Sequence, residues 1–252
     1  MVTMRLLLTN DDGIHSEGIK VLADFLSVLG EVWVVAPDRE RNAVSHALTL
    51  HRPLRLTKLS DYSYAVNGTP SDCINIGINF LLPARPDLIV SGINKGGNLG
   101  NDINYSGTVA GAVEGALMGV PSFSISLSAD RDFKFKPAAQ FAVRLARSIA
   151  ENGLPAQTVL NVNVPDTGGK EINRYTITTQ GTATHTNTIE EKTDPRGFTY
   201  YWIGRKHDNR EESNRADTSD LKAVREKSIS ITPLHLDRTH HASFEALTRL
   251  TL

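Results

Sequence analysis

The chain has 252 residues, of which 40% are hydrophobic, and a formal net charge of −1. This allows one large domain, or one domain with an arm, and the near-neutral charge excludes a strongly basic nucleic-acid-binding protein or an anionic-membrane binder. The single cysteine, Cys73, excludes an internal disulfide and fits a reducing compartment. No apolar run approaches ~18 residues, and the N-terminal run does not have the form of a signal peptide, so we expect a cytoplasmic enzyme that has no contact with a membrane.

Hydrophobic periodicity predicts alternating strands and helices up to about residue 165. A strand over 5–9, a helix over 18–29 and a strand over 31–36 form a β-α-β unit, which implies parallel strands with a right-handed crossover. The next predicted elements are strands at 55–57 and 64–67, a helix at 71–82, a strand at 88–91, a helix at 108–119, a strand at 121–127, a helix at 138–150 and a strand at 159–164. This order predicts an α/β fold with a Rossmann-like, doubly wound, mainly parallel sheet over residues 1–165.

The sequence becomes polar and rich in threonine after about residue 166. We predict strands at 199–203 and 228–232, with Pro233 ending the second, and a charged loop at 208–215. Residues 166–252 are therefore interpreted as a β-rich C-terminal arm whose last strand rejoins the core. The arm contains four aromatic residues that polar sequence cannot bury: Phe198, Tyr200, Tyr201 and Trp202. They predict an interface with a partner subunit, and the alternative is an arm folded back on its own core.

Two adjacent carboxylates, Asp11 and Asp12, follow the first predicted strand directly, after Asn10. In an open α/β sheet, ligands bind outside the carboxyl ends of the strands. Two acids at such a place repel each other unless a cation or a proton intervenes, so they suit a hard divalent cation. The alternative is a simple turn in which Asp12 or Ser16 caps the following helix.

Two further loops are expected to open on the same edge of the sheet. Asn42, after the second strand, offers a neutral oxygen ligand that suits Mg²⁺ or Mn²⁺, whereas a solvated charged loop is the simpler alternative. The run at 92–100 is rich in glycine and asparagine, which lets a ligand approach the backbone closely, although a flexible turn would have the same composition. It is neither a Walker A loop nor a dinucleotide fingerprint.

The helix predicted at 108–119 begins beside two hydroxyl groups, those of Ser106 and Thr108. Its unpaired N–H groups suit an anion, and simple N-capping by Ser106 is the alternative. Glycines at every fourth position predict that this helix packs unusually close to the sheet: Gly107, Gly111, Gly115 and Gly119. Cys73 is interpreted as a buried structural thiol rather than a nucleophile, and His46 is a weaker candidate to face the site.

Five runs of this chain, in this order, resemble the SurE family of metal-dependent nucleotidases. They are Thr-Asn-Asp-Asp-Gly-Ile at 9–14, Val-Ala-Pro-Asp-Arg at 35–39 followed by Asn42, Gly-Thr-Pro-Ser-Asp-Cys at 68–73, Val-Ser-Gly-Ile-Asn at 90–94 with Gly-Asn-Leu-Gly at 97–100, and Tyr-Ser-Gly-Thr-Val at 105–109. The late run Ser-Ile-Ser-Ile-Thr-Pro-Leu at 228–234 also resembles that family. The resemblance spans nearly the whole chain.

The resemblance implies one divalent metal ion per subunit, Mg²⁺ or Mn²⁺, with four ligands: Asp11, Asp12, Asn42 and Asn94. Many members carry serine at the third position, so Asn42 is a mild departure, and the Lys-Gly-Gly run at 95–97 also differs from the commoner pattern. The phosphate would contact Asn98, Ser106, Gly107 and Thr108, with Asn10 supporting them. Asp11 and Asp12 would also be the catalytic residues, one of them orienting or deprotonating the attacking water.

The implied function is metal-dependent hydrolysis of nucleoside 5′-monophosphates, with 3′-monophosphates as a second expected substrate. The implied assembly is a homodimer or a tetramer formed through exchanged C-terminal arms. One alternative from the residues is a non-catalytic nucleotide-binding module that uses the same loops. A second is a sugar-processing enzyme, which adjacent acids disfavour because a glycosidase pair must lie about 5 Å or more apart across the scissile bond.

Overall fold

The computed structural model describes residues 3–182, 186–206 and 218–250. Its strands are β1 (Met4–Thr9), β2 (Gly30–Pro37), β3 (Leu56–Ser60), β4 (Ser63–Val66), β5 (Leu88–Lys95), β6 (Ser122–Ser128), β7 (Thr158–Pro165), β8 (Tyr175–Ile177), β9 (Thr186–Thr193), β10 (Thr199–Lys206) and β11 (Ile229–His235). Its α-helices are α1 (Glu17–Leu26), α2 (Pro70–Ile76), α3 (Gly107–Leu117), α4 (Lys136–Asn152), α5 (Asp220–Arg225) and α6 (Phe244–Leu247). The helices and strands predicted up to residue 165 are confirmed, with ends that differ by a few residues.

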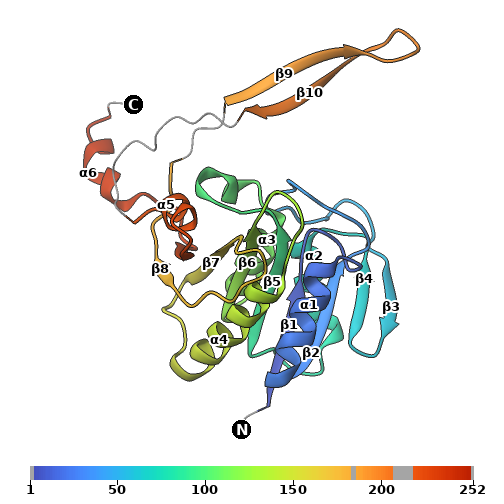
Figure 1. Cartoon of the computed structure of the whole chain (residues 1–252), viewed down its shortest axis with the longest axis vertical. Helices are drawn as coiled ribbons and strands as arrows, with labels where there is room; N and C mark the ends of the chain where they lie inside the picture. The colour runs from blue at the N-terminus through green and yellow to red at the C-terminus, as the bar shows by residue number, and fades with distance from the viewer. Residues whose placement is uncertain (1–2, 183–185, 207–217, 251–252) are drawn as a thin grey trace.

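One nine-stranded sheet, in the order β3-β4-β2-β1-β5-β6-β7-β11-β8, forms the body of the molecule (Figure 1). All neighbouring pairs from β4 to β7 are parallel, which confirms the predicted α/β fold. The chain passes from β1 to β2 on one side and later from β5 through β7 on the other. The carboxyl ends of β1 and β5 therefore meet where the winding direction reverses, and this is where such sheets bind ligands.

Helices cover both faces of the sheet because successive side chains of a strand point to opposite faces. Leu6 and Leu8 of β1 pack in the core cluster formed with α1 and α4, whereas Leu7 between them joins the cluster on the α2 side. Ile19 and Leu22 of α1 are buried at helical spacing, because this amphipathic helix turns one apolar face to the sheet. The packing holds β1 as a rigid central strand, so the residues that follow it have a fixed position.

One face of β6, β7 and β11 is buried although its side chains are polar. In two rows across the sheet, serine, asparagine and threonine lie side by side in register. We call these residues the polar ladder: Ser124, Asn161 and Thr232 in one row, and Ser126, Asn163 and Ser230 in the other, all at most 2% exposed. Buried polar groups must find partners, so this face is suited to hold other polar segments in place.

Two local predictions are wrong in detail. β5 continues past Ser91 to Lys95, with a register shift between Gly92 and Asn94. β11 continues through Pro233 to His235. Ile231, two residues before Pro233, accepts the Thr178 N–H with its carbonyl on the β8 side. The backbone nitrogen of Pro233 faces the same side, beyond the end of β8, so the strand loses no hydrogen bond through the proline. β8, α5 and α6 were not predicted, because short elements have too little periodicity to detect.

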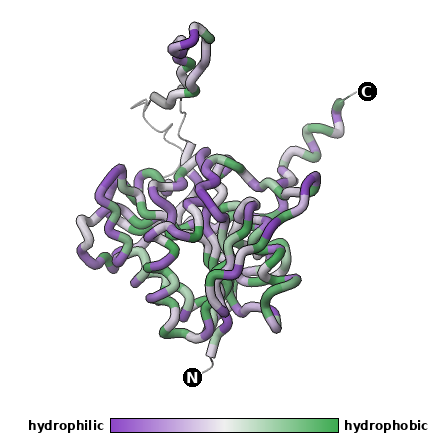
Figure 2. Tube along the Cα trace, turned by 90° about the vertical axis from the view of Figure 1, so that its right-hand side faces the viewer, coloured by the Kyte–Doolittle hydropathy of each residue, from purple (hydrophilic) through white to green (hydrophobic). Residues whose placement is uncertain are grey.

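The antiparallel strands β9 and β10 form a separate two-stranded sheet. This hairpin stands clear of the body, at the opposite end from the N-terminus, in two views at right angles (Figures 1 and 2). Its aromatic side chains are exposed: Phe198 by 69%, Tyr200 by 40%, and Tyr201 and Trp202 each by 61%. The charged loop predicted at 208–215 lies outside the described residues. Within the described ranges, the helices are all too short or too polar to cross a membrane.

Candidate active site

The turn after β1 is fixed by Asn10 and Gly13. The Asn10 amide donates to the Gly13 carbonyl at 3.0 Å and to the Ser16 hydroxyl at 2.8 Å. Gly13 has φ of +91°, and a Cβ atom there would lie 3.0 Å from the carbonyl carbon of Arg39, so only glycine fits. The turn therefore places the two aspartates at the carboxyl edge of the sheet, beside the loop that follows β2.

Asp11 is 4% exposed and is held by the start of α3. The Thr108 backbone N–H donates to Asp11 Oδ2 at 3.0 Å, and the Thr108 hydroxyl donates to Oδ1. A Cβ atom at Gly107 would lie 2.9 Å from Asp11 Cβ. The main-chain carbonyl of Asp11 accepts the Arg41 N–H at 2.7 Å. Burial is the largest influence on this carboxyl and raises its pKa, against the hydrogen bonds from Thr108.

Asp12 lies at the same edge and accepts the Lys95 backbone N–H at 3.1 Å, so it joins the end of β1 to the end of β5. Burial, followed by the charge of Asp11, raises the pKa of Asp12 to about 6. The Glu40 carboxylate raises the pKa of both aspartates further. Sequence reasoning did not single out Glu40. Among the described residues, no three His, Cys, Asp or Glu side chains gather closely enough to hold a metal ion, so neutral oxygen ligands would have to complete such a site.

The two candidate amide ligands differ in burial and in their hydrogen-bond partners. Asn94 is half-buried on β5, and its amide N–H donates to the Gly96 carbonyl at 2.9 Å, which leaves Oδ1 as an acceptor. Asn42 is exposed, and its amide donates to the Glu40 carboxylate. The neighbouring Arg41 N–H bonds to Asp11, so the Asn42 loop is attached to the site although its side chain is turned toward Glu40.

The predicted phosphate-binding residues lie around the start of α3 and in the loop after β5. The Ser106 hydroxyl accepts the Val109 N–H at 3.0 Å and therefore caps α3, as the simpler interpretation predicted. The Thr108 hydroxyl is directed at Asp11. Asn98 is 7% exposed, and its amide donates to the Ser126 hydroxyl at 2.8 Å.

The glycine stripe of α3 packs closely on the sheet, as predicted. A Cβ atom at Gly111 would lie 2.8 Å from Thr9 Cγ2, and one at Gly115 would lie 2.6 Å from Ser122 Oγ. Gly119 differs, because it follows the end of the helix and has φ of +75°. The close approach fixes the N-terminus of α3 against the end of β1.

A family model described as survival protein SurE matches residues 6–187 of this chain. The chain belongs to the SurE family. It is similar to the 5′-nucleotidase SurE of Pelobacter propionicus, at 54% identity over 246 residues, covering 97% of this chain and 98% of that protein. It is also similar to the 5′-nucleotidase SurE of Geotalea uraniireducens, at 51% identity over 250 residues and 99% and 100% coverage. The crystal structure of the SurE protein from Aquifex aeolicus has a TM-score of 0.85 and 39% identity, covering 97% of this chain and 98% of that one.

Several groups that support this SurE site were missed from the sequence. Asn161 and Asn163 of the polar ladder bond to Asn98, and the alternating Ser-x-Ser and Asn-x-Asn patterns of β6 and β7 were a signal that could have found them. Asp220 is fully buried and accepts the Gly100 N–H at 2.8 Å and the Gly181 N–H at 2.9 Å. It thus connects the loop after β5 with the segment that leads toward the hairpin.

His46 and Cys73 contact the helices or the core rather than the aspartate pair. His46 Nε2 lies 2.5 Å from the Glu114 carboxylate of α3, which also accepts the Asn75 amide at 2.5 Å. These contacts hold the loop after β2 on the helices rather than placing His46 at the aspartate pair. Cys73 is fully buried, as predicted, and burial raises the pKa of its thiol well above the usual value, which disfavours the nucleophilic thiolate.

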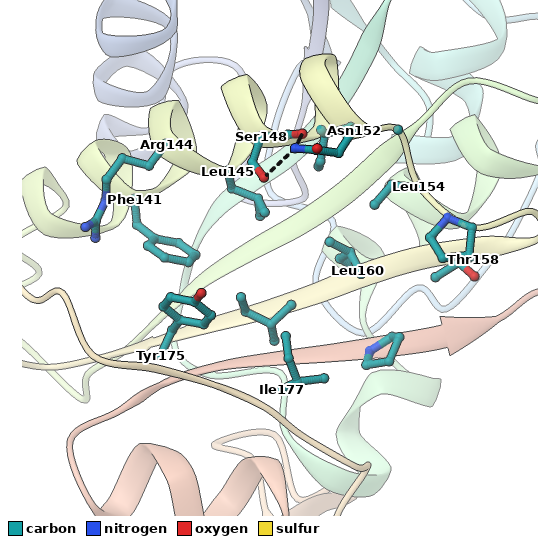
Figure 3. Close-up of a pocket in the computed structure, with 15 residues that line it drawn as sticks. Phe141, Arg144, Leu145, Ser148, Asn152, Leu154, Thr158, Leu160, Tyr175 and Ile177 are labelled. Carbon is teal, nitrogen blue, oxygen red and sulfur yellow. Dashed lines mark hydrogen bonds between the residues drawn. The ribbon is translucent and has the colours of Figure 1, made fainter.

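A hollow of about 450 Å³ lies elsewhere, between α4 and the strands β7, β8 and β11 (Figure 3). Its walls are largely apolar and include Phe141, Leu145, Leu160, Tyr175 and Ile177. None of the predicted site residues lines it. It has neither the acidic pair nor the helix start that phosphate chemistry would use, so the carboxyl edge remains the candidate active site of this SurE protein.

Proposed function

We propose that this chain is a phosphomonoesterase that hydrolyses nucleoside 5′-monophosphates to nucleoside and phosphate. The observation that carries the proposal is the contact of Asp11 with the start of α3 where the winding of the sheet reverses. It combines an acidic pair, which suits a divalent cation, with a helix N-terminus, which suits a phosphate group, and phosphoryl transfer depends on such positioning and charge stabilisation. The names of the similar SurE proteins support the substrate class, and we propose nucleoside 3′-monophosphates as a second substrate.

The donor groups fit one divalent metal ion, Mg²⁺ or Mn²⁺. Asp11 is buried, Asp12 is half-buried, and the charge of Asp11 raises the pKa of Asp12, so a hard cation would stabilise this pair of carboxylates, and oxygen ligands suit both ions. We assign the ligands to Asp11, Asp12, Asn42 and Asn94. Asn94 has a free acceptor direction at Oδ1, whereas Asn42 would exchange its hydrogen bond to Glu40 for the metal ion.

When bound, the metal ion supplies charge neutralisation at the phosphate and lowers the pKa of a water molecule. The residues of the chain then provide positioning. Thr108 fixes both oxygens of Asp11 through two hydrogen bonds. Asp12 is less buried than Asp11, so we propose that it orients the attacking water and accepts its proton.

The phosphate is proposed to bind where the loop after β5 meets the start of α3. The Gly107 N–H and the positive end of the helix dipole favour an anion there, whereas the N–H groups of Thr108 and Val109 already bond to Asp11 and Ser106. Ser106 and Thr108 hold that turn through the cap and the contact with Asp11. The Asn98 amide offers a further donor, and Asn10 supports the shell by fixing the turn after β1.

Residues 1–165 are proposed to form the catalytic core, and residues 166–252 the arm that mediates assembly together with the C-terminal strand β11, which returns to the core sheet. The exposed aromatic side chains of β10 support a homodimer or tetramer formed through exchanged arms. The single, buried thiol of Cys73 supports a reducing, cytoplasmic environment.

The test is phosphate release from nucleoside 5′- and 3′-monophosphates by the pure protein, first with a chelator and then with Mg²⁺ or Mn²⁺ restored. We expect turnover only with the metal, and a loss of more than about a hundredfold in Asp12→Asn. Asp24→Asn, on the exposed side of α1, is the matched control. No turnover with either metal would favour the non-catalytic nucleotide-binding module, and full turnover by Asp12→Asn would remove the acidic pair from the reaction.

A further inference from the structure

Two asparagines of β7 hold the backbone of Asn98. Asn163 accepts the Asn98 N–H at 2.7 Å and donates to the Asn98 carbonyl at 3.0 Å. Asn161 donates to the same carbonyl at 2.8 Å. Both asparagines are fully buried. The backbone donor and the backbone acceptor of one residue are thus bound by side chains that lie more than sixty positions later in the sequence.

Serines of β6 bind both to Asn161 and to the side chain of Asn98. The Ser124 hydroxyl donates to Asn161 Oδ1 at 2.9 Å, and the Asn98 amide donates to Ser126 Oγ at 2.8 Å. A buried amide is costly unless its polar atoms are paired, and a network that pairs them favours one arrangement of the residues involved. The polar ladder therefore fixes the position of Asn98 and the direction of its side chain together.

The loop around Asn98 needs such support because its own backbone specifies little. Gly96 and Gly100 on either side have φ of +98° and +53°, in the left-handed region that glycine enters most readily. A glycine-flanked loop has many accessible conformations when free. The bonds from β7 select one of them.

We propose that Asn163, assisted by Asn161, is a positioning residue that orients the Asn98 amide toward the substrate phosphate. This inference rests on the proposed function, in which Asn98 contacts the phosphate. An amide nitrogen has two N–H groups, and one donates to Ser126, which leaves the second for a phosphate oxygen. A displacement of such a donor by about 1 Å can cost up to about a hundredfold in rate.

The test compares Asn163→Ala with Thr178→Val. Thr178 lies next to the β11 end of the polar ladder and is 4% exposed, and its hydroxyl bonds to Ser230 at 3.0 Å and to Thr232 at 2.8 Å. Both variants lose buried hydrogen bonds and should melt at lower temperature. For Asn163→Ala we expect kcat/KM for a nucleoside monophosphate to fall about tenfold to thirtyfold, and the inhibition constant for inorganic phosphate to rise by a similar factor. Thr178→Val should keep both constants within about twofold.

A double-mutant cycle separates positioning from general loosening of the fold. If Asn163 acts through the Asn98 side chain, then Asn163→Ala in an Asn98→Ala background lowers kcat/KM by less than about threefold, while its effect on melting temperature persists. The positioning role would be overturned if the double variant lost kcat/KM by the product of the two single-variant factors. It would also be overturned if Asn163→Ala and Thr178→Val lost kcat/KM equally. If Asn163→Ala does not fold, Asn163→Ser and Asn161→Ala enter the same cycle.

The wild-type measurement keeps the two proposals apart. Absence of metal-restored hydrolysis by the wild-type protein contradicts the proposed function. Normal hydrolysis by the wild type, together with kcat/KM of Asn163→Ala within about twofold of it, contradicts only the positioning role.

Discussion

Thr108 binds both carboxylate oxygens of Asp11 across 97 residues of sequence. Its backbone N–H lies 3.0 Å from Oδ2, and its hydroxyl donates to Oδ1. The first contact comes from the free N–H groups of a helix start and the second from a side chain, so substitution can remove one and keep the other. The pair joins the end of β1 to α3 and fixes the more buried of the two aspartates.

Replacing Thr108 by valine removes the hydroxyl and keeps the shape and the backbone N–H. A hydrogen bond to a charged group contributes about 1.5–3 kcal/mol, so we expect kcat/KM to fall at least about tenfold in Thr108→Val. Thr108→Ser retains the hydroxyl and is expected to retain most of the activity. Steady-state phosphate release measures both, and similar activity in the two variants would show that the hydroxyl is not needed.

Substitution of two glycines on one face of α3 should have separate effects. A Cβ atom at Gly107 would press on Asp11 Cβ, so Gly107→Ala is expected to displace the aspartate and lower kcat at least about tenfold. Gly115 lies two turns farther along the helix, and a Cβ atom there would meet Ile89 and Ser122. Gly115→Ala should therefore lower the free energy of unfolding by about 1–3 kcal/mol through overpacking. Urea denaturation and kcat together test this, and loss of kcat in Gly115→Ala alone would contradict it.

Divalent metal ions are expected to stabilise the protein before any reaction occurs. Binding at about 100 times the dissociation constant contributes about 2.7 kcal/mol, which corresponds to a rise in melting temperature of about 5–10 °C for a chain of this size. Calorimetry with Mn²⁺, and again after a chelator, measures the shift. Asp12→Asn should abolish the rise and Asp24→Asn should keep it, whereas an undiminished shift in Asp12→Asn would place the metal elsewhere.

Glu114 predicts a pH dependence of stability. The hydrogen bond with His46, followed by that from Asn75, holds the pKa of the Glu114 carboxyl below its ordinary value of 4.5. The unfolded chain therefore takes up a proton first as the pH falls, so this contribution to stability is present above pH 4.5 and is lost below it.

Glu114→Gln tests that dependence. We expect the variant to be less stable than the wild type by about 2 kcal/mol at pH 7, and the difference to shrink as the pH falls below about 4. Urea midpoints at pH 7 and pH 3.5 measure it, with Glu151→Gln, an exposed residue of α4, as control. A difference that stays constant between the two pH values would exclude the Glu114 carboxylate as its source.

The hairpin is expected to hold the assembly together through its apolar side chains. Tyr201 and Ile203 lie on one face of β10, and Ile203 pairs with Ile189 of β9. Burial of each contributes about 1.5–3 kcal/mol, so Tyr201→Ser with Ile203→Ser should weaken association at least about a hundredfold. Light scattering should then give the monomer mass, while Leu50→Ser, 88% exposed on another loop, leaves the mass unchanged. An unaltered mass in the double variant would contradict the role of the hairpin.

The sequence by itself determined the elements whose signals are local. The apolar strand β1, the amphipathic α1 and the strand β2 were predicted because each has its full periodicity within about ten residues. Asp11 and Asp12 were predicted as site residues for a similarly local reason, since they follow a strand directly and strand ends are where such folds bind ligands. Gly107, Gly111 and Gly115 likewise predicted close packing from their spacing alone.

Only the tertiary structure decided which distant groups meet these residues. Thr108 bonds to Asp11, Asn163 bonds to Asn98 and Asp220 bonds to Gly100, and each pair is separated by at least 65 positions. The hydroxyls and amides concerned have many possible partners, and local spacing does not choose among them. The order of the strands determines the partners, because it places β1 beside β5 and β6 beside β7. Since these polar groups are buried, each must form a hydrogen bond with a group that the fold places near it.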